Sequence, residues 1–150
     1  MSGDLCKTRP IFLPGSDYPT ATNHRLAAIA SWPAWVRLHR SFKPRTQWHV
    51  SQPECQNKAP GNQCDEYPEQ RTREGGNPTG TTNHRPSLDK NVTKDDNLGL
   101  GGAFGVFLGQ RVVPTGCKIP DGGEFLVIPL PPVLGIPTQT GICNFPLPIP

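Results

Sequence analysis

Four acidic side chains lie close together in the segment "QCDEYPEQRTREGG", residues 63–76, which also holds a cysteine and a Gly-Gly pair: Asp65, Glu66, Glu69 and Glu74. Magnesium prefers oxygen ligands and keeps several of its waters, so carboxylates grouped in a glycine-containing loop form a candidate site for a hard divalent cation. The spacing does not match an EF-hand loop. Judged by charge and spacing alone, a solvated acidic turn is the simpler interpretation.

A second charged segment, residues 24–49, is basic. It contains five Arg or Lys residues and three His, with no carboxylate among them. Such a segment could lie along the phosphates of a nucleic acid, or it could be a basic solvated surface. The whole chain has 15 basic and 12 acidic residues and a formal charge of +3, which permits a polyanionic partner without requiring one.

The elements that must position these residues are expected to be short. The chain has 19 Pro and 16 Gly in 150 residues, so the composition favours a loop-rich domain. Residues 1–20 are Pro-rich and are expected to be extended. The segment "HRLAAIA" predicts a short helix that starts near Thr22 or Asn23 and is interrupted at Trp32-Pro33, and "AWVRLHRSF" predicts a further helical turn or two.

Further along the chain, the pattern predicts two strands around the basic and acidic segments. The alternation in "TQWHVS" indicates one strand, and "CDEYP" indicates another that ends at Pro68. The acidic start of "DDNLGLGGAFGVFLG" predicts a helix beginning near Asn97, although its five glycines weaken a helix by about 1 kcal/mol each relative to Ala. "GGEFLVIPL" is the clearest buried strand, and the Pro-rich residues 129–150 are expected to form an extended tail.

Read in order, several of these segments resemble the NucA/NucB family of secreted bacterial deoxyribonucleases. The matching boxes are "CDEYP", an "EGG" box in which Glu74 follows Asp65 by nine positions, "DDNLGLGG", and the closing apolar strand "EFLVIP". Upstream, "YPTATNHRLAAIA" is similar to the family's Tyr-Pro segment with its His and short helix. The resemblance covers roughly residues 12–128, and Glu69 lies at a position that is usually apolar in the family.

The resemblance implies a small metal-dependent nuclease related to the ββα-metal group, with an Asp in place of the usual catalytic His. On the matching positions, Asp65 is the candidate general base, and Glu74 and Asn97 are the candidates for the catalytic metal site. His24 matches the upstream His and is a candidate substrate contact, but a helix-face His that fixes local packing is an equal alternative. Arg85, in the insertion between the boxes, is either a phosphate clamp or an exposed side chain.

This assignment agrees with the chemistry of phosphodiester hydrolysis. The reaction needs a base that deprotonates water and a cation that neutralises charge on the scissile phosphate. Asp65 is ionised near pH 7, but an ordinary pKa of about 3.9 makes it a weak base. Burial, or repulsion from the adjacent Glu66, would raise that pKa. Asn97 at a helix start could offer a neutral oxygen to the metal.

The remaining histidines and tryptophans receive structural interpretations. His39 and His49 have no counterpart in the resemblance and are read as surface or structural residues. Trp32, Trp35 and Trp48 could stack on bases, but in a small domain they are more often core residues.

Five cysteines indicate a disulfide framework in preference to a zinc site, because no CxxC pair is present. Cys55 and Cys64 bracket a polar loop that a disulfide could close, but the sequence does not fix the pairing of the five cysteines. An odd count leaves one thiol over or paired elsewhere. The N-terminus shows no signal-peptide pattern and the chain has no membrane-length apolar run, so we expect a processed secreted protein or a delivered effector.

These observations predict an α+β domain over residues 1–128, with a small antiparallel sheet, few short helices and a ββα-metal-like core, followed by a tail over 129–150. The predicted function is a metal-dependent endodeoxyribonuclease that uses Mg²⁺ or Mn²⁺, has DNA as its partner and, if it is a toxin module, an immunity protein. The alternative is a non-catalytic, disulfide-stabilised extracellular binding module.

Overall fold

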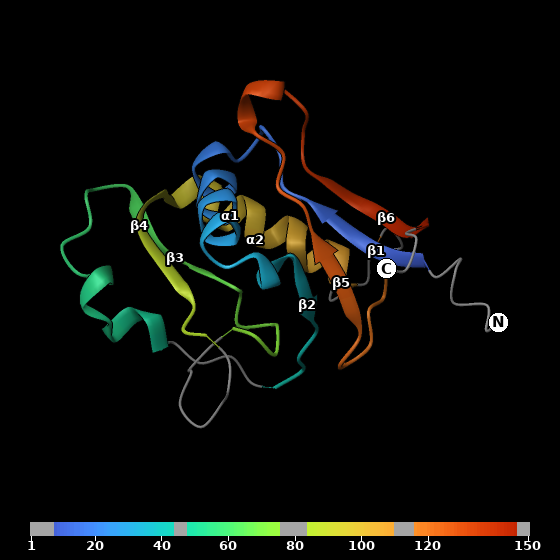
Figure 1. The fold of residues 1–150 in the computed structure, drawn as a ribbon. Helices are drawn as coiled ribbons and strands as arrows, with labels where there is room; N and C mark the ends of the chain where they lie inside the picture. Colours follow the sequence, from blue (N-terminus) through green and yellow to red (C-terminus); the bar gives the residue numbers. More distant parts are fainter. Residues whose placement is uncertain (1–7, 44–47, 76–83, 110–115, 147–150) are drawn as a thin grey trace.

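The computed structural model describes residues 8–43, 48–75, 84–109 and 116–146. Two helices, α1 (Pro19–Ser31) and α2 (Lys94–Leu108), lie between a four-stranded sheet and a two-stranded sheet (Figure 1). The strands are β1 (Thr8–Leu13), β2 (Arg37–His39), β3 (Asn62–Tyr67), β4 (Ser87–Thr93), β5 (Glu124–Val127) and β6 (Gln139–Pro146). Short 3-10 turns are η2 (Pro33–Val36), η3 (Trp48–Ser51), η4 (Pro53–Cys55) and η5 (Pro132–Leu134). The α+β prediction is confirmed.

The two sheets differ in strand direction. β3 and β4 form an antiparallel pair, as predicted. The larger sheet has the order β2-β5-β1-β6 and is mixed, because β1 runs parallel to β5 and antiparallel to β6. The expectation of a purely antiparallel sheet is therefore wrong for this sheet. A parallel pair needs a long crossover connection, and the helices and the β3–β4 pair lie in the chain between β1 and β5.

The hydrophobic core lies between α2 and the larger sheet. Phe104 and Phe107 on one face of α2 contact Phe12 of β1 and Phe125 of β5, with ring centroids 5.3 to 5.7 Å apart. All four side chains are buried. Because this packing fixes the rotation of α2, it also decides which face of the helix turns toward β3.

The helices begin earlier than the sequence predicts. α1 starts at Pro19 and not at Thr22 or Asn23, because proline at the first helical position lacks an N–H that would be unpaired there anyway. α2 starts at Lys94, where Thr93 caps it by accepting a hydrogen bond from the Asp96 amide at 3.2 Å.

Two segments around the basic region differ from the prediction. The predicted strand around Trp48 is wrong: residues 48–51 form η3, with the Ser51 hydroxyl bonded back to the Trp48 carbonyl at 3.1 Å. The predicted second helix is reduced to η2, and the chain then continues as β2, whose Leu38 is buried against the core.

The structure also differs from the expected C-terminal tail in residues 139–146. These residues form β6, which pairs with β1, and Cys143 forms a disulfide with Cys117. Alternating prolines made the segment read as a linker, but prolines are tolerated in an edge strand such as β6. The prediction of disulfide bonds is confirmed, because Cys55 and Cys64 form a second one that closes the polar loop. Cys6 lies outside the described residues.

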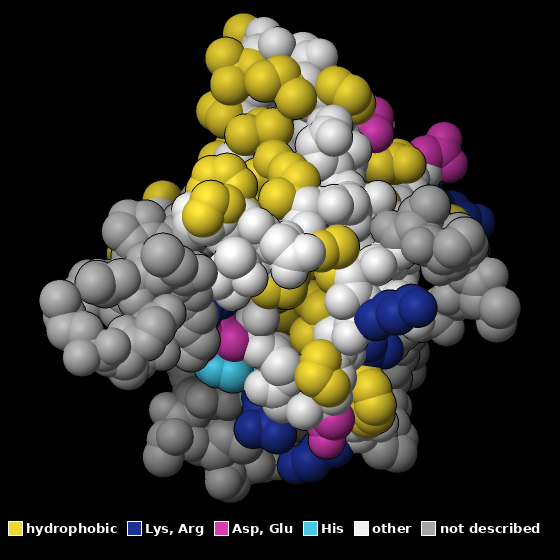
Figure 2. All heavy atoms as spheres, turned by 90° about the vertical axis from the view of Figure 1, so that its right-hand side faces the viewer, with side chains coloured by type: hydrophobic (Ala, Val, Ile, Leu, Met, Phe, Trp, Pro, Cys, Tyr) yellow, Lys and Arg dark blue, Asp and Glu magenta, His cyan; other side chains and the backbone are white. Residues whose placement is uncertain are grey.

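The connection between β5 and β6 projects from the body of the molecule and is apolar. Figure 2 shows hydrophobic side chains gathered at this end, where Val133 is 90% exposed and Leu134 is 57% exposed. Within the described ranges, none of the helices has the length and apolar character needed to cross a membrane.

Candidate active site

A cleft of about 690 Å³ lies between β3, η3 and α2. β3 contributes Asp65 and Glu66, η3 contributes His49, and α2 contributes Asn97 together with a face of glycines. The predicted site residues Asp65 and Asn97 are thus brought to one cleft. The predicted Glu74 and Arg85 do not line it, and His24 reaches it only through Asp65.

Asp65 is held by two residues of α1. The His24 Nδ1 lies 2.7 Å from Asp65 Oδ2, and Arg25 Nη1 donates to the same oxygen at 2.8 Å. The other ring nitrogen of His24 lies 2.9 Å from the Ser87 hydroxyl. His24 is buried behind Asp65 and does not line the cleft, so its position agrees with the alternative of a helix-face His that fixes local packing.

The charge state of Asp65 differs from the expectation for a general base. Burial opposes its ionisation, but the charge of Arg25 and the hydrogen bond from His24 outweigh burial and hold the pKa of Asp65 below its ordinary value. The anticipated rise in pKa is therefore not found. Asp65 stays ionised at neutral pH and is a poorer proton acceptor than an unperturbed carboxylate.

Arg25 joins Asp65 to a second carboxylate, Glu69. Its other terminal nitrogen donates to Glu69 Oε1, and the guanidinium also lies over the ring of Tyr67. Burial works against the charge of Arg25, yet the two carboxylates hold its pKa above the ordinary value. Burial raises the pKa of Glu69, with Arg25 and Arg71 opposing it in part.

Asn97 lies in the first turns of α2 and faces β3. Its amide nitrogen donates to Gln63 Oε1 at 2.8 Å, which orients the side chain so that Oδ1 is the atom left to accept a ligand. Gln63 and Asn97 both line the cleft. The sequence assignment of Asn97 to the site agrees with this position.

Glu74 lies outside the cleft, next to the larger sheet. Its carboxylate accepts a hydrogen bond from the His39 amide at 3.0 Å, and its other oxygen lies 2.5 Å from His39 Nδ1. His39 in turn lies 3.6 Å from Glu124. The structure thus separates Glu74 from Asn97 by placing the residues after Pro68 along β2, and the predicted Glu74–Asn97 metal pair is not formed.

Arg85 is engaged on the surface away from the cleft lining. It pairs with Glu54 at 2.6 Å, donates to Gln52 at 3.2 Å and lies over the ring of Trp48 at 5.0 Å. Residues 76–83 of the same insertion lie outside the described part of the chain.

The basic segment of residues 24–49 is not a continuous charged surface. Arg25 and Arg40 are buried, and Arg40 donates to the carbonyls of Leu108 and Ile119. Arg37 is exposed beside Glu124, and Lys43 is exposed. Buried arginines that bond to backbone or carboxylates cannot contact phosphates, so the segment contributes fewer phosphate contacts than its charge suggests.

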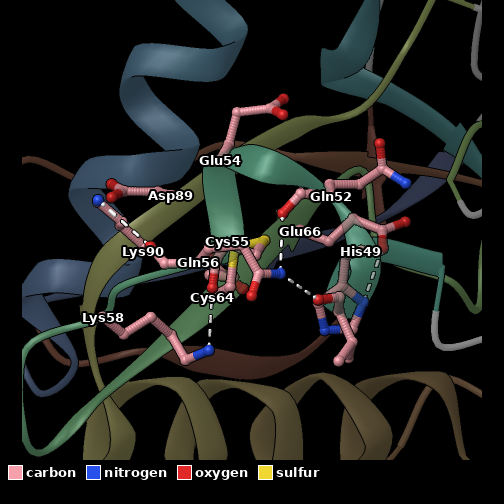
Figure 3. The surroundings of a disulfide bond; sticks show 12 residues. His49, Gln52, Glu54, Cys55, Gln56, Lys58, Cys64, Glu66, Asp89 and Lys90 are labelled. Atoms are coloured by element: carbon pink, nitrogen blue, oxygen red, sulfur yellow. Dashed lines mark hydrogen bonds and ion pairs between the residues drawn. A yellow bond between two sulfur atoms is a disulfide. The ribbon is translucent and has the colours of Figure 1, made fainter.

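His49 is the site residue that the sequence reasoning did not assign. Its Nδ1 lies 3.2 Å from Glu66 Oε2 and 3.1 Å from Gln70 Nε2. Figure 3 shows His49 and Glu66 pointing toward each other, with the Cys55–Cys64 disulfide nearby. The signal that could have found His49 is the loop that Cys55 and Cys64 bracket, because Cys64 directly precedes Asp65 and a disulfide there ties this turn to the acidic strand.

Comparisons with known proteins give no support for or against a family: no family model matches the chain, and no curated protein matches it. In the part of the chain that the structure describes, no group of three or more His, Cys, Asp or Glu side chains could hold a metal ion. The function therefore has to be argued from the cleft itself.

Proposed function

We propose that this protein is a metal-dependent endonuclease that hydrolyses DNA phosphodiester bonds in the cleft between β3, η3 and α2. The observation that carries the proposal is the order β3, β4, α2, which forms a ββα unit with Asp65 on the first strand and Asn97 on the helix, both facing one cleft. This is the arrangement that the resemblance to the NucA/NucB family implies for these two residues.

The donor set at the cleft fits a hard divalent cation, but with different residues from those predicted. Both contacts of Asp65 go to Oδ2, so Oδ1 is the carboxylate oxygen that a cation could take. Asn97 Oδ1 supplies a neutral oxygen, and one or two carboxylates with waters are a usual environment for Mg²⁺. Asp65 and Asn97 would hold the ion, and Glu74 would not. When bound, such a cation neutralises charge on the phosphate and the leaving oxygen.

The remaining charges at the cleft suit a polyanionic substrate. Lys58 and Arg71 line it, and Lys58 is exposed with its amine bonded to the Cys55 carbonyl at 3.0 Å. Arg25 neutralises much of the negative charge of Asp65 and Glu69, so a phosphate entering the cleft meets less repulsion than the acidic sequence suggests.

One observation favours the rival function, a non-catalytic binding module. Arg25 already compensates Asp65 and Glu69 internally, so the acidic segment is stable without a cation. Two disulfides suit either function, and both functions suit an oxidising compartment. An immunity protein stays a prediction that belongs to the toxin form of the nuclease.

Supercoiled plasmid DNA tests the proposal. We expect nicking or degradation with Mg²⁺ or Mn²⁺, no cleavage with EDTA, and a loss of about 100-fold or more in rate for Asp65→Asn, since removing one electrostatic stabiliser from an active site costs that much. Asp121→Asn is the matched control, because Asp121 is exposed and binds the Phe42 amide away from the cleft. Circular dichroism confirms that each variant is folded.

The outcomes separate the two functions. A folded wild-type protein that leaves plasmid DNA intact with every divalent metal contradicts the nuclease and leaves the binding module. If the wild-type protein cleaves DNA and the Asp65→Asn variant is fully active, only the role of Asp65 is contradicted and the nuclease function stands. Parallel reactions on single-stranded DNA and RNA define the substrate.

A further inference from the structure

The cleft contains a histidine that the proposed function has not yet used. His49 lies on η3, its side chain is 19% exposed, and it lines the cleft that contains Asp65 and Asn97. The other described histidines are engaged elsewhere: His24 is buried behind Asp65, His39 bonds Glu74, and His84 stacks on Trp32 with ring centroids 4.1 Å apart. Among the described residues, His49 is the one imidazole that faces this space.

The neighbours of His49 define which ring nitrogen carries the proton. Nδ1 lies near both Glu66 Oε2 and the Gln70 amide nitrogen, and that amide also lies 3.5 Å from the same carboxylate oxygen. A carboxylate is a stronger partner than a neutral amide, so the arrangement favours Nδ1–H donating to Glu66, with the Gln70 amide directed to the carboxylate as well. Nε2 is then the nitrogen with a free lone pair.

The position of the ring is fixed by a covalent link to the acidic strand. The Gln52 amide donates to the His49 carbonyl at 3.1 Å, the Cys55 amide donates to the Gln52 carbonyl at 3.0 Å, and Cys55 is bonded to Cys64. Cys64 is followed directly by Asp65 and Glu66. One short chain of contacts therefore holds the turn of His49 beside the strand that carries Glu66 (Figure 3).

The cleft needs a proton acceptor that Asp65 does not provide. The Oδ2 atom of Asp65 already accepts hydrogen bonds from Arg25 and His24, and protonating the carboxylate would break these two buried contacts. Hydrolysis at neutral pH works best with an acceptor whose pKa lies near the working pH, and histidine is the side chain whose ordinary value does so.

We propose that His49, oriented by Glu66, is the catalytic proton acceptor of this cleft. The inference rests on the proposed nuclease function. A water molecule loses a proton to His49 Nε2, its oxygen forms a bond to phosphorus, and the bond from phosphorus to the leaving sugar oxygen breaks. That oxygen then takes a proton from solvent, and the imidazolium formed is stabilised by the Glu66 carboxylate.

His49→Gln tests the proposal, with His84→Gln as the matched control. We expect His49→Gln to lower kcat by about 100-fold or more while KM stays within about twofold, because general base catalysis contributes roughly 10²- to 10⁴-fold and the residue does not hold the DNA. His84→Gln, outside the cleft, should keep kcat within about twofold. His49→Gly should regain at least tenfold in rate when imidazole is added, a response that a structural role would not give.

The pH dependence provides the second readout. The charged groups that share the cleft with His49 are Arg25, Lys58, Asp65, Glu66, Glu69 and Arg71. The wild-type rate should show an acidic limb in its pH profile, because only an unprotonated acceptor takes the proton from water, and His49→Gln should lack this limb. Glu66→Gln should retain the limb at a lower plateau.

Each failure has a distinct meaning. A wild-type protein that cleaves DNA, with a His49→Gln variant of equal kcat, overturns the role of His49 and leaves the nuclease. A folded His49→Gly variant that imidazole does not rescue also overturns it. A folded wild-type protein that cleaves no DNA overturns the nuclease and His49 with it.

Discussion

Arg25 decides the charge of the candidate site, although it is buried and cannot touch a substrate. It binds Asp65 and Glu69 with its two terminal nitrogens, and it completes a buried group in which one cation faces two anions. The contact also gives Glu69 a role, because its carboxylate pairs with the terminal nitrogen of Arg25 that Asp65 does not bind.

The buried group of Arg25, Asp65 and Glu69 predicts how the free energy of unfolding depends on pH. The pKa of Asp65 is lowered, so its contribution to stability is present above its unfolded value and is lost as pH falls through the lower folded value. We expect Asp65→Asn to lower the free energy of unfolding by roughly 3–5 kcal/mol at pH 7, as for other broken buried ion pairs. Urea unfolding at pH 2.5 to 7 measures the difference.

The difference between wild type and Asp65→Asn should shrink as pH falls below about 4, because the carboxyl of the unfolded chain is protonated first and the folded-state carboxyl follows only at a lower pH. Glu69 acts in the opposite direction, since its raised pKa removes stability as pH rises through the folded value. Asp121→Asn should follow the wild type throughout. A difference for Asp65→Asn that is constant across this range would contradict the assigned ion pair.

Part of the candidate site could be assigned from sequence motifs, and the rest depends on how the chain folds. Asp65 and Asn97 could be assigned from their motifs, because both motifs also fix local structure, a strand end and a helix start. Glu74 could not be placed correctly, since its position depends on how the chain turns back along β2. His49 has no motif, and only the folded contact with Glu66 gives it a role.

The glycines of α2 serve two different purposes along one helix. A Cβ on Gly99 would lie 2.2 Å from the ring of Tyr18, so this glycine allows Tyr18, the residue just before α1, to pack against α2. Gly102 has open space around it and lies on the cleft. Close packing therefore requires a glycine at position 99 and not at position 102.

A pair of alanine substitutions separates these purposes. Gly102→Ala should raise the free energy of unfolding by about 1 kcal/mol, because Ala is the better helix former. Gly99→Ala should lower it by about 1–3 kcal/mol, because the overpacking at Tyr18 exceeds the same gain in helix propensity. Thermal and urea unfolding of both variants give the signs, and a stabilised Gly99→Ala would contradict the packing.

The elements that the sequence predicted well are those whose local signals agree with their packing. β5 and α2 each contain a clear apolar run, and β3 was indicated by the segment that ends at Pro68. The segment of η3 alternates like a strand, but its side chains bond to their own backbone, and the segment has no sheet partner. β2 and β6 pair only with distant strands, so no local pattern could indicate them.

Two disulfides join regions that the sheets do not connect. Cys55–Cys64 ties η4 to β3 across 9 residues, and Cys117–Cys143 ties the chain after α2 to β6 across 26 residues. We expect Cys117→Ser/Cys143→Ser to lower the free energy of unfolding by about 3 kcal/mol and Cys55→Ser/Cys64→Ser by about 2–3 kcal/mol, following the entropy of the closed loops.

The two double variants should differ in activity. Removing the Cys55–Cys64 bond frees the turn that carries His49. The Cys55→Ser/Cys64→Ser variant should therefore cleave plasmid DNA more slowly than the wild type even at a temperature where the variant is fully folded. Opening Cys117–Cys143 affects the far side of the sheet and should leave the cleavage rate close to wild type. An equal loss of cleavage rate in both double variants would indicate that activity depends on the stability of the whole domain and not on the turn that carries His49.

The central place of β1 in the larger sheet affects how the protein can be made. Both of its neighbours, β5 and β6, come much later in the chain than β1 itself. A nascent chain therefore holds an unpaired apolar strand until residues near 146 have left the ribosome or the export channel. Because Phe12 of that strand packs against α2, the late pairing of β1 also steadies the helix that forms one wall of the cleft.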